Sequence, residues 1–393
     1  PAIYFQAPNS FTGEDVLELQ GHGGPVIANC LLQRVLQLGA RLARPGEFSE
    51  RAFLNSKLDL VQAEAISDLI DAESEQAARA AIRSLQGEFS KRIDGMREAL
   101  IALRMCLEAS IDFSDETIDV LKDSELKRKL NAILVDIREI KNLAKQGALL
   151  QEGISLAIVG PPNAGKSSLL NRLGAQESAI VTSHAGTTRD VIREKIQIDG
   201  LPVHIVDTAG LRITENEIEQ EGIKRTLAEI VKADYVLWVV DHTTTSIGDL
   251  KFWQQQKAFL KDIVVDERLI IIRNKIDLKQ ENADLSKEAG FDAIKLSAKT
   301  GEGLTLLRSY LKKRIAYKVT TEGNFSARRR HLEALTNTEI VLAHGLLKLQ
   351  GHQFPELIAE DLLMAQKYLG EITGQFTTND LLGKIFSSFC IGK

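Results

Sequence analysis

The chain has 393 residues, more than one compact domain usually holds, and this length predicts two or three domains. Its 44% apolar and 26% charged residues are typical of an ordinary globular protein. The net charge of -5 argues against a protein that coats nucleic acid non-specifically, although a local basic patch could still bind RNA.

Cysteines and apolar runs indicate the compartment. Cys30, Cys106 and Cys390 are too few for a disulfide framework and lack the spacing of zinc ligands, which favours a reducing, cytoplasmic setting. Because Cys30 and Cys106 stand in apolar helical patterns, we expect both in a core. No apolar run approaches the ~20 residues that span a bilayer, and no signal peptide is recognisable.

The first 56 residues combine turn signals with strand-like runs. Glycines and prolines such as Gly21, Gly23, Pro25 and Pro45 separate the apolar stretches, which is typical of part of an α+β unit. The sequence starts at Pro1 without a methionine and runs straight into a strand-like stretch. We therefore expect that the native N-terminus lies further upstream.

Residues 57–150 repeat apolar side chains at helical spacing, for example Ile66 and Ile70 on one face. Gly87 and the acidic stretch 112–119 mark the expected breaks between helices. This segment is predicted to be the first half of a helical domain.

Residues 151–317 change to short apolar strands that alternate with helical stretches, which predicts a parallel sheet with crossover helices. Helical patterns return in residues 318–393. We therefore predict an α/β domain inserted into a helical domain whose two halves pack together. The predicted strands are Leu156–Val159, Val203–Val206, Val236–Val240, Leu269–Ile272 and Ala293–Leu296.

One motif in the third segment carries specific chemistry. Residues 160–167 (GPPNAGKS) match the P-loop pattern in full, after a strand and before a helix, which is the context that this motif requires. Backbone N–H groups of such a loop contact phosphate oxygens, and Gly165 permits their close approach. Lys166 neutralises the β- and γ-phosphates, and the Ser167 hydroxyl binds Mg²⁺.

Four shorter motifs follow in the order expected of a GTPase. Asp207 to Gly210 (DTAG) ends a strand, and its carboxylate holds Mg²⁺ through water. Gly186 to Asp190 occupies the first switch, with Thr188 as the hydroxyl that reaches Mg²⁺. Asn274 to Asp277 (NKID) selects guanine, because its aspartate accepts from donors that adenine lacks. Ser297 to Lys299 (SAK) closes over the base.

Hydrolysis must differ from that of small Ras-like GTPases, because Leu211 replaces the glutamine that orients the attacking water there. A K⁺ ion bound by Asn163 and by backbone carbonyls of residues 182–187 could supply positive charge. The alternative is that Asn163 is a plain loop residue. The acidic run from Glu215 to Glu221 could orient the water, or could be a solvated helix start.

Other residues also leave two interpretations open. Cys390 could be a thiol near a reaction site or a small buried residue. The basic run from Arg328 to His331 could contact nucleic-acid phosphates or simply begin a charged helix. Trp238 and Trp253 are expected to pack in cores.

Six stretches across the chain together point to one family: Asn9–Asp15, Gly21–Gly24, Ala43–Ser49, Phe53–Leu60, Gly186–Asp190 and the terminal Phe389–Lys393. Through them the whole sequence resembles the MnmE (TrmE) family of bacterial GTPases that modify the wobble uridine of tRNA. The C-I-G-K end is the most specific of these stretches.

The resemblance implies a multidomain fold: a Ras-like P-loop GTPase domain with a parallel-rich sheet, inserted into a helical domain and preceded by a partial α+β folate-binding domain. Roughly 60 residues of that first domain would be missing. The domains would be residues 1–56, 57–150 with 318–393, and 151–317. GTP contacts would be Asn163, Ala164, Gly165, Lys166, Ser167, Ser168, Thr182, Ser183, His184, Ala185, Gly186, Thr187, Thr188, Asp207, Thr208, Ala209, Gly210, Asn274, Lys275, Asp277, Ser297, Ala298 and Lys299.

The resemblance also assigns ions, catalysis and folate. Mg²⁺ would be bound by Ser167 and Thr188, with Lys166, Glu219 and Cys390 as catalytic candidates, of which Glu219 orients the water. The K⁺ ligands would be Asn163, Thr182, His184 and Thr187, with His184 contributing its backbone carbonyl. The folate contacts would be Glu18, Lys57 and Lys393.

The implied partners make the chain part of a larger system. A homodimer would pair its GTPase domains in the presence of K⁺, which stimulates hydrolysis. MnmG, which uses FAD and NADH, would join in a heterotetramer-type complex. With 5,10-methylene- or 5-formyl-tetrahydrofolate as the one-carbon source, they would add an aminomethyl or carboxymethylaminomethyl group to C5 of the wobble uridine (U34) of tRNA, without contact to a membrane.

Two other functions remain to be weighed. A switch GTPase for ribosome assembly or scaffolding would have the same GTPase motifs, but such proteins lack these flanking domains and the C-I-G-K end. A P-loop ATPase is opposed by residues 274–277.

Overall fold

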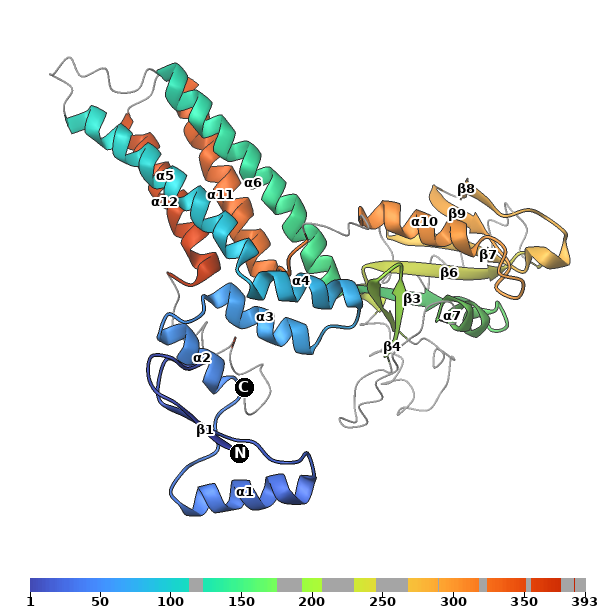
Figure 1. The fold of residues 1–393 in the computed structure, drawn as a ribbon. Coiled ribbons are helices and arrows are strands. Elements are labelled where there is room, and N and C mark those ends of the chain that lie inside the picture. Colours follow the sequence, from blue (N-terminus) through green and yellow to red (C-terminus); the bar gives the residue numbers. More distant parts are fainter. Residues whose placement is uncertain are drawn as a thin grey trace, which may run out of the picture. The chain divides into compact units, whose positions relative to one another are not determined.

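The structure is a computed structural model, which describes residues 1–112, 123–174, 193–206, 230–244, 268–288, 290–317, 324–350, 355–375 and 385. The chain forms two compact units (Figure 1). The helical unit comprises Pro1–Ala72, Ala77–Ala148 and Glu322–Lys393. The sheet unit comprises Glu73–Gln76 and Leu149–Thr321, so that it is inserted in the chain of the helical unit, as the sequence predicts.

The helical unit begins with a small α+β region. Strands β1 (Ala2–Phe5) and β2 (Val16–Leu19) pair antiparallel. Helix α1 (Pro25–Gln37) starts with a proline, whose fixed φ suits the first turn of a helix, and α2 (Glu47–Leu54) follows.

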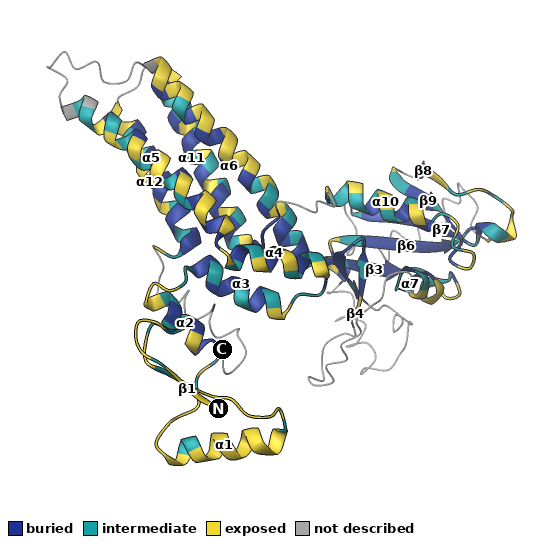
Figure 2. Cartoon of the chain, in the orientation of Figure 1, coloured by how far each residue is buried: buried dark blue, intermediate teal, exposed yellow. Residues whose placement is uncertain are grey.

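Helix α1 corrects one prediction. It has no buried residue, and Cys30 on it is exposed, so the expectation that Cys30 lies in a core is wrong (Figure 2). The apolar pattern of this helix is genuine, but none of the described residues covers it, and Val26 is 73% exposed. Cys106 is partly buried.

Long helices make up the rest of the helical unit. Asp59 begins the first of them with a capping box, in which its carboxylate accepts from the Gln62 N–H and the Gln62 side chain bonds back to the Asp59 backbone. Gly87, with a φ of 82°, separates two helices at a predicted break, whereas the other predicted break lies largely outside the described residues. The helices are α3 (Leu60–Ile70), α4 (Glu75–Leu85), α5 (Glu88–Asp112), α6 (Asp123–Glu152), α11 (Arg329–Gln350) and α12 (Pro355–Thr373).

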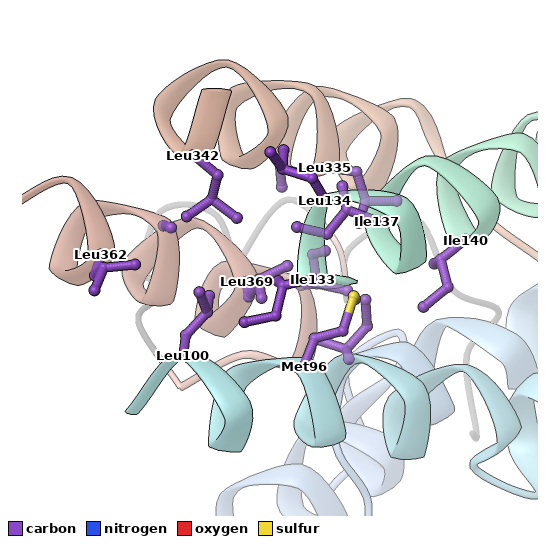
Figure 3. Packing of buried hydrophobic residues seen from close by; sticks show 14 of the residues in the cluster. Met96, Leu100, Ile133, Leu134, Ile137, Ile140, Leu335, Leu342, Leu362 and Leu369 are labelled. Carbon is purple, nitrogen blue, oxygen red and sulfur yellow. The ribbon is translucent and has the colours of Figure 1, made fainter. Parts of the chain in front are cut away.

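The core of this unit lies between α5, α6, α11 and α12. Leu100, Ile137, Leu335 and Leu369, one from each helix, are completely buried and converge in Figure 3. Burying an aliphatic side chain of this size contributes roughly 2 kcal/mol. Segments from before and after the sheet unit in the chain therefore share one core, and the two helical halves pack together as predicted.

The sheet unit is built on a seven-stranded sheet of order β4-β5-β3-β6-β7-β9-β8. The strands from β5 to β9 in this order are parallel, and the edge strands β4 and β8 are antiparallel to their neighbours. The predicted strands are confirmed. The strands are β3 (Ile154–Val159), β4 (Arg193–Ile198), β5 (Leu201–Val206), β6 (Tyr235–Asp241), β7 (Leu269–Asn274), β8 (Asp284–Glu288) and β9 (Phe291–Lys295).

Strands β4 and β8 are absent from the prediction because edge strands lack a continuous apolar run. Charged residues interrupt both of them, as in the sequences REKIQI and DLSKE. By contrast, every residue of β7 is buried, as expected of a central parallel strand that is covered on both faces.

Helices α7 (Lys166–Gly174) and α10 (Leu304–Ile315) complete the described core of the sheet unit, and each contributes fully buried leucines. Trp238 is 2% exposed, which confirms that it packs in the core, while Trp253 lies outside the described residues. Among the helices that the structure describes, none has the length and apolar character to cross a membrane.

Candidate functional site

Four adjacent parallel strands present their carboxyl ends at one edge of the sheet. In open α/β sheets ligands bind outside this edge. Strand β3 leads into residues 160–167, β6 ends at Asp241, β7 ends at Asn274 and β9 is followed closely by Ser297. The sheet order therefore brings three of the predicted nucleotide motifs to one edge.

The loop after β3 needs glycine at two positions. A Cβ atom on Gly160, whose φ is 151°, would lie 2.1 Å from the carbonyl oxygen of Val239. A Cβ atom on Gly165, whose φ is 93°, would lie 2.2 Å from Asn274 Nδ2. Asn163 has a φ of 64°, which asparagine tolerates better than most residues. The loop backbone can therefore approach its neighbours, and a ligand, closely.

Lys166 is the cation of this loop. Its Nζ donates to the carbonyl oxygens of Gly160 and Pro161, at 2.8 and 2.9 Å. Partial burial lowers the pKa of this lysine from its ordinary value. Helix α7 starts at Lys166, where the first N–H groups of a helix have no partner within the helix, and Ser167 and Ser168 in this first turn are exposed.

Asn274 joins three of the predicted motifs. Its Nδ2 donates to Ala164 O in the P-loop at 2.8 Å. Its Oδ1 accepts from the N–H groups of Lys275, at 2.8 Å, and Ala298, at 2.9 Å. Because Asn274 is only 2% exposed, these bonds hold the P-loop, the NKID motif and the SAK motif together in a protected setting.

Asp277 is oriented by the SAK motif. The Ser297 hydroxyl donates to Asp277 Oδ1 at 2.7 Å, and Ser297 itself is fully buried. Asp277 is half-buried, and Lys299, in the chain segment after β9, is exposed. One oxygen of Asp277 is thereby fixed by the protein, which orients the other for a ligand.

Sequence reasoning missed Asp241. This residue ends β6, and its Oδ2 accepts from Lys275 Nζ at 2.6 Å. The only local signal is an aspartate at the carboxyl end of a buried strand, next to the strand that carries the NKID motif.

Several predicted site residues lie outside the described residues. They are Thr182, Ser183, His184 and Ala185, then Gly186, Thr187 and Thr188 of the first switch, Asp207, Thr208, Ala209 and Gly210, and Glu219, Cys390 and Lys393. Their roles stay predictions. Within the described residues, no group of three or more histidine, cysteine, aspartate or glutamate side chains is placed to hold a metal ion.

The two described folate candidates lie in the α+β region. Lys57 Nζ donates to Pro8 O at 3.0 Å, and exposed Glu18 accepts from Gln20 Nε2 at 3.3 Å. No hydrogen bond or ion pair joins Lys57 to Glu18 in the described part of the chain. A cleft of about 280 Å³ in the same region is lined by other residues, including Thr12, Glu14, Arg41, Glu47 and Arg51.

Glu47 organises that cleft. Arg41, the Arg44 N–H and Arg51 all donate to its carboxylate, and these bonds hold the pKa of Glu47 well below its usual range. Glu14 pairs with Arg51 at 2.6 Å. Glu47, the first residue of α2, therefore holds the segment before this helix and the helix itself together.

The basic run from Arg328 to His331 faces mainly inward. Arg330 donates to both oxygens of buried Glu64, at 2.8 and 2.6 Å. Arg328 bonds to buried Asp68 at 2.6 Å, and His331 is 2% exposed. Only Arg329 of the four is largely exposed, and it pairs with Glu333. This run is a buried ion-pair cluster that begins α11, which disfavours the interpretation that it contacts RNA phosphates.

Family models match almost the whole chain. The model described as "MnmE helical domain" matches residues 60–390, and the one described as "GTP-binding protein TrmE N-terminus" matches residues 2–57. Three relatives named "tRNA modification GTPase MnmE" align over 100% of this chain and 86% of their own length. They are from Ectopseudomonas mendocina (strain ymp), 58% identical, Histophilus somni (strain 129Pt), 56%, and Yersinia pseudotuberculosis serotype IB (strain PB1/+), 55%.

Similarity to solved structures is weaker. A GTP-binding protein from the hyperthermophilic archaeon Sulfolobus solfataricus in complex with GDP is 23% identical, with a TM-score of 0.32 over 56% of this chain and 67% of that one. The FeoB G-domain from Methanococcus jannaschii is 24% identical, with a TM-score of 0.29 over 42% and 98%.

Proposed function

This chain belongs to the MnmE family of tRNA modification GTPases, and from that premise we propose that it binds and hydrolyses GTP at the carboxyl edge of its sheet during tRNA modification. The observation that carries the proposal is the position of Asn274. Its buried carboxamide joins the P-loop to the two motifs that are expected at the base. Chance matches to three separate motifs would give no such convergence.

The bound nucleotide would extend along this edge. The guanine would contact the free oxygen of Asp277, with residues 297–299 beside it, and the phosphates would meet the N–H groups of the P-loop and of the first turn of α7. Lys166 already bonds to two loop carbonyls, so its ammonium would exchange these for phosphate oxygens and stabilise the charge that develops there during hydrolysis.

The described residues also fit two cations. Ser167 is exposed in the first turn of α7, where its hydroxyl would bind Mg²⁺ together with Thr188. Asn163 is exposed on the loop and would bind K⁺ with Thr182, His184 and Thr187. When bound, these ions supply positive charge against the phosphates. Glu219 would orient the attacking water.

The proposal extends to the partners that family membership suggests. Glu18, Lys57 and Lys393 would contact a tetrahydrofolate that carries one carbon, and Cys390 would lie near the modification site. A homodimer of this chain would act in the cytoplasm with MnmG on the wobble uridine of tRNA. The matches to the two family models, over residues 2–57 and 60–390, support this function over ribosome assembly.

Analysis of the wobble uridine in tRNA from cells that lack this protein tests the function directly. We expect the C5 modification to disappear, to return with the wild-type chain, and to stay absent with Asp277→Asn. Fully modified tRNA in the deletion strain would refute the tRNA function, and defective ribosome profiles in its place would favour the assembly GTPase.

Purified protein tests the nucleotide site separately. Asp277→Asn should weaken GTP binding by at least about tenfold and shift preference to xanthosine triphosphate, because the amide cannot accept from both guanine donors. An unchanged preference would mean that the base is read elsewhere.

Hydrolysis by the wild type should be faster in K⁺ than in Na⁺, and equal rates would eliminate the K⁺ site.

A further inference from the structure

Strand β6 lies between the phosphate end and the base end of the proposed site. In the order β3-β6-β7, the P-loop follows β3 and the NKID motif follows β7. A nucleotide with its phosphates at one and its base at the other must therefore cross the carboxyl end of β6. Asp241 is the last residue of that strand and is paired in register with Asn274.

The Asp241 carboxylate is fully engaged at that point. Its Oδ1 accepts from the Thr243 N–H at 2.8 Å and from the Thr243 hydroxyl at 2.6 Å, so a turn of the chain fixes its orientation. Its Oδ2 accepts from Lys275 Nζ at 2.6 Å. Partial burial raises the pKa of Asp241, but the bonds from Lys275 and Thr243 outweigh this and lower it, so the Asp241 carboxylate is ionised at neutral pH.

Lys275 therefore reaches from β7 back over the end of β6. Its backbone has a φ of 72°, a left-handed conformation that costs free energy in a lysine. Both its Nζ and its backbone are held, the latter by the bond from its N–H to Asn274 Oδ1 at 2.8 Å. The aliphatic stem between these two fixed ends lies across the path that the nucleotide must take.

We propose that Asp241 is a positioning residue for guanine nucleotide, which holds the Lys275 ammonium so that the stem of this lysine forms an apolar wall under the guanosine. The inference rests on the proposed function and deepens it. Because both Asp241 oxygens are used by the protein, Asp241 acts through Lys275 instead of contacting the ligand. Ordering a lysine side chain has a large entropic cost. Because the bond to Asp241 already orders Lys275, nucleotide binding does not have to include this cost.

The test is a double-mutant cycle in the whole 393-residue chain, with the affinity for a fluorescent GDP analogue as the readout. Asp241→Asn is expected to weaken the analogue about fivefold and to speed its release, because the neutral amide no longer anchors the ammonium. Lys275→Met keeps an aliphatic stem but removes the anchored charge. The double variant should bind no more weakly than Lys275→Met alone, because Asp241 acts only through this lysine.

A second ligand separates positioning from general damage. Inorganic pyrophosphate, measured by competition, has no base or ribose to rest on Lys275, so Asp241→Asn should leave its affinity unchanged. Glu339→Gln is the control: it removes a carboxylate of the helical unit that pairs with a lysine, Lys141, at 2.9 Å, and should bind the GDP analogue like the wild type.

Three outcomes would overturn the inference: wild-type affinity of Asp241→Asn for the GDP analogue, additive losses in the double variant, or an equal loss for pyrophosphate. If Asp241→Asn fails to fold, Thr243→Val, which removes one bond to Asp241 Oδ1, should weaken the analogue in the same direction, and unchanged affinity would again overturn it. If the wild-type chain itself binds no GDP analogue, the proposed function fails, which is a different result.

Discussion

The carboxyl edge of the sheet unit and the basic run of the helical unit both concentrate cations, but they use them differently. At the edge, Lys166 bonds to neutral carbonyl oxygens and keeps its charge available for an anionic ligand. In the basic run, Arg330 forms two bonds to buried Glu64, which neutralises it. A buried ion pair of this kind stabilises one arrangement of the chain and has no capacity left for a phosphate.

The difference teaches that the partner of a charge, and not its sequence context, separates a ligand site from a structural cluster. Arg328 to His331 looks more basic in sequence than the P-loop does, yet only Arg329 among them is largely exposed. The predictions below test this contrast from the largest effect to the smallest.

Lys166→Ala should affect hydrolysis most. Loss of a charge-assisted contact to the phosphates should slow GTP turnover by at least about 100-fold, which corresponds to roughly 3 kcal/mol. Steady-state phosphate release measures it, and the melting temperature should hardly change. Lys287→Ala removes an exposed lysine of the edge strand β8 and serves as the control. Normal turnover by Lys166→Ala would contradict the proposal that this lysine binds the phosphates.

Glu64→Gln should have the opposite profile. It leaves Arg330 without its buried carboxylate, so the free energy of unfolding should fall by roughly 3 kcal/mol, while GDP affinity stays unchanged. Urea denaturation followed by circular dichroism measures the first, and nucleotide titration the second. Glu333→Gln breaks the exposed pair with Arg329 at the same helix start and should cost less than about 0.5 kcal/mol. Equal losses for the two variants would show that burial does not matter here.

Acid should destabilise the same cluster. Burial lowers the pKa of His331 from 6.5 to about 4, so the folded chain binds fewer protons than the unfolded chain between these values. Stability should therefore fall, by roughly 2 kcal/mol, as the pH decreases from about 6.5 towards 4. Burial raises the pKa of Glu64, but Arg330 and His331 outweigh this and lower it. Protonation of Glu64 at still lower pH should therefore reduce the stability further.

The hydrogen bonds of His331 indicate which neutral tautomer it adopts. Its Nδ1 accepts from the Arg328 N–H at 3.0 Å, so the ring proton is on Nε2, which lies 3.1 Å from Glu64. His331→Gln should flatten the pH dependence of the urea midpoint between pH 6.5 and 4. A slope equal to that of the wild type would assign the acid sensitivity to other groups.

Ser297→Ala should have the smallest effect. The hydroxyl only orients Asp277, so its loss should weaken GDP by about 1 kcal/mol, or roughly fivefold, with guanine still preferred over xanthine. Isothermal titration measures it, with Ser286→Ala on β8 as the control. A loss as large as that of Asp277→Asn would mean that Ser297 contacts the base itself.

The sequence by itself predicted the P-loop, the NKID and SAK motifs and the central parallel strands, and the structure confirms the strands. Each of these features depends on residues that are close in the sequence. The P-loop needs glycines that permit a positive φ, the NKID motif needs Asp277 close to Lys275, and strands buried on both faces need continuous apolar runs. The family resemblance extended this to the whole chain. The roles of the site residues stay predictions, and the first switch, Glu219 and the C-terminal residues also lie outside the described residues.

Only the tertiary structure decided how Arg330, Asp241 and Cys30 are used. Arg330 meets Glu64, 266 residues away in the chain, and Asp241 meets Lys275 because their strands are neighbours in the sheet. Cys30 is exposed because none of the described residues covers α1. A local pattern shows that a side chain is charged or apolar, but its partner is set by which distant segments pack beside it, and that partner fixes its role.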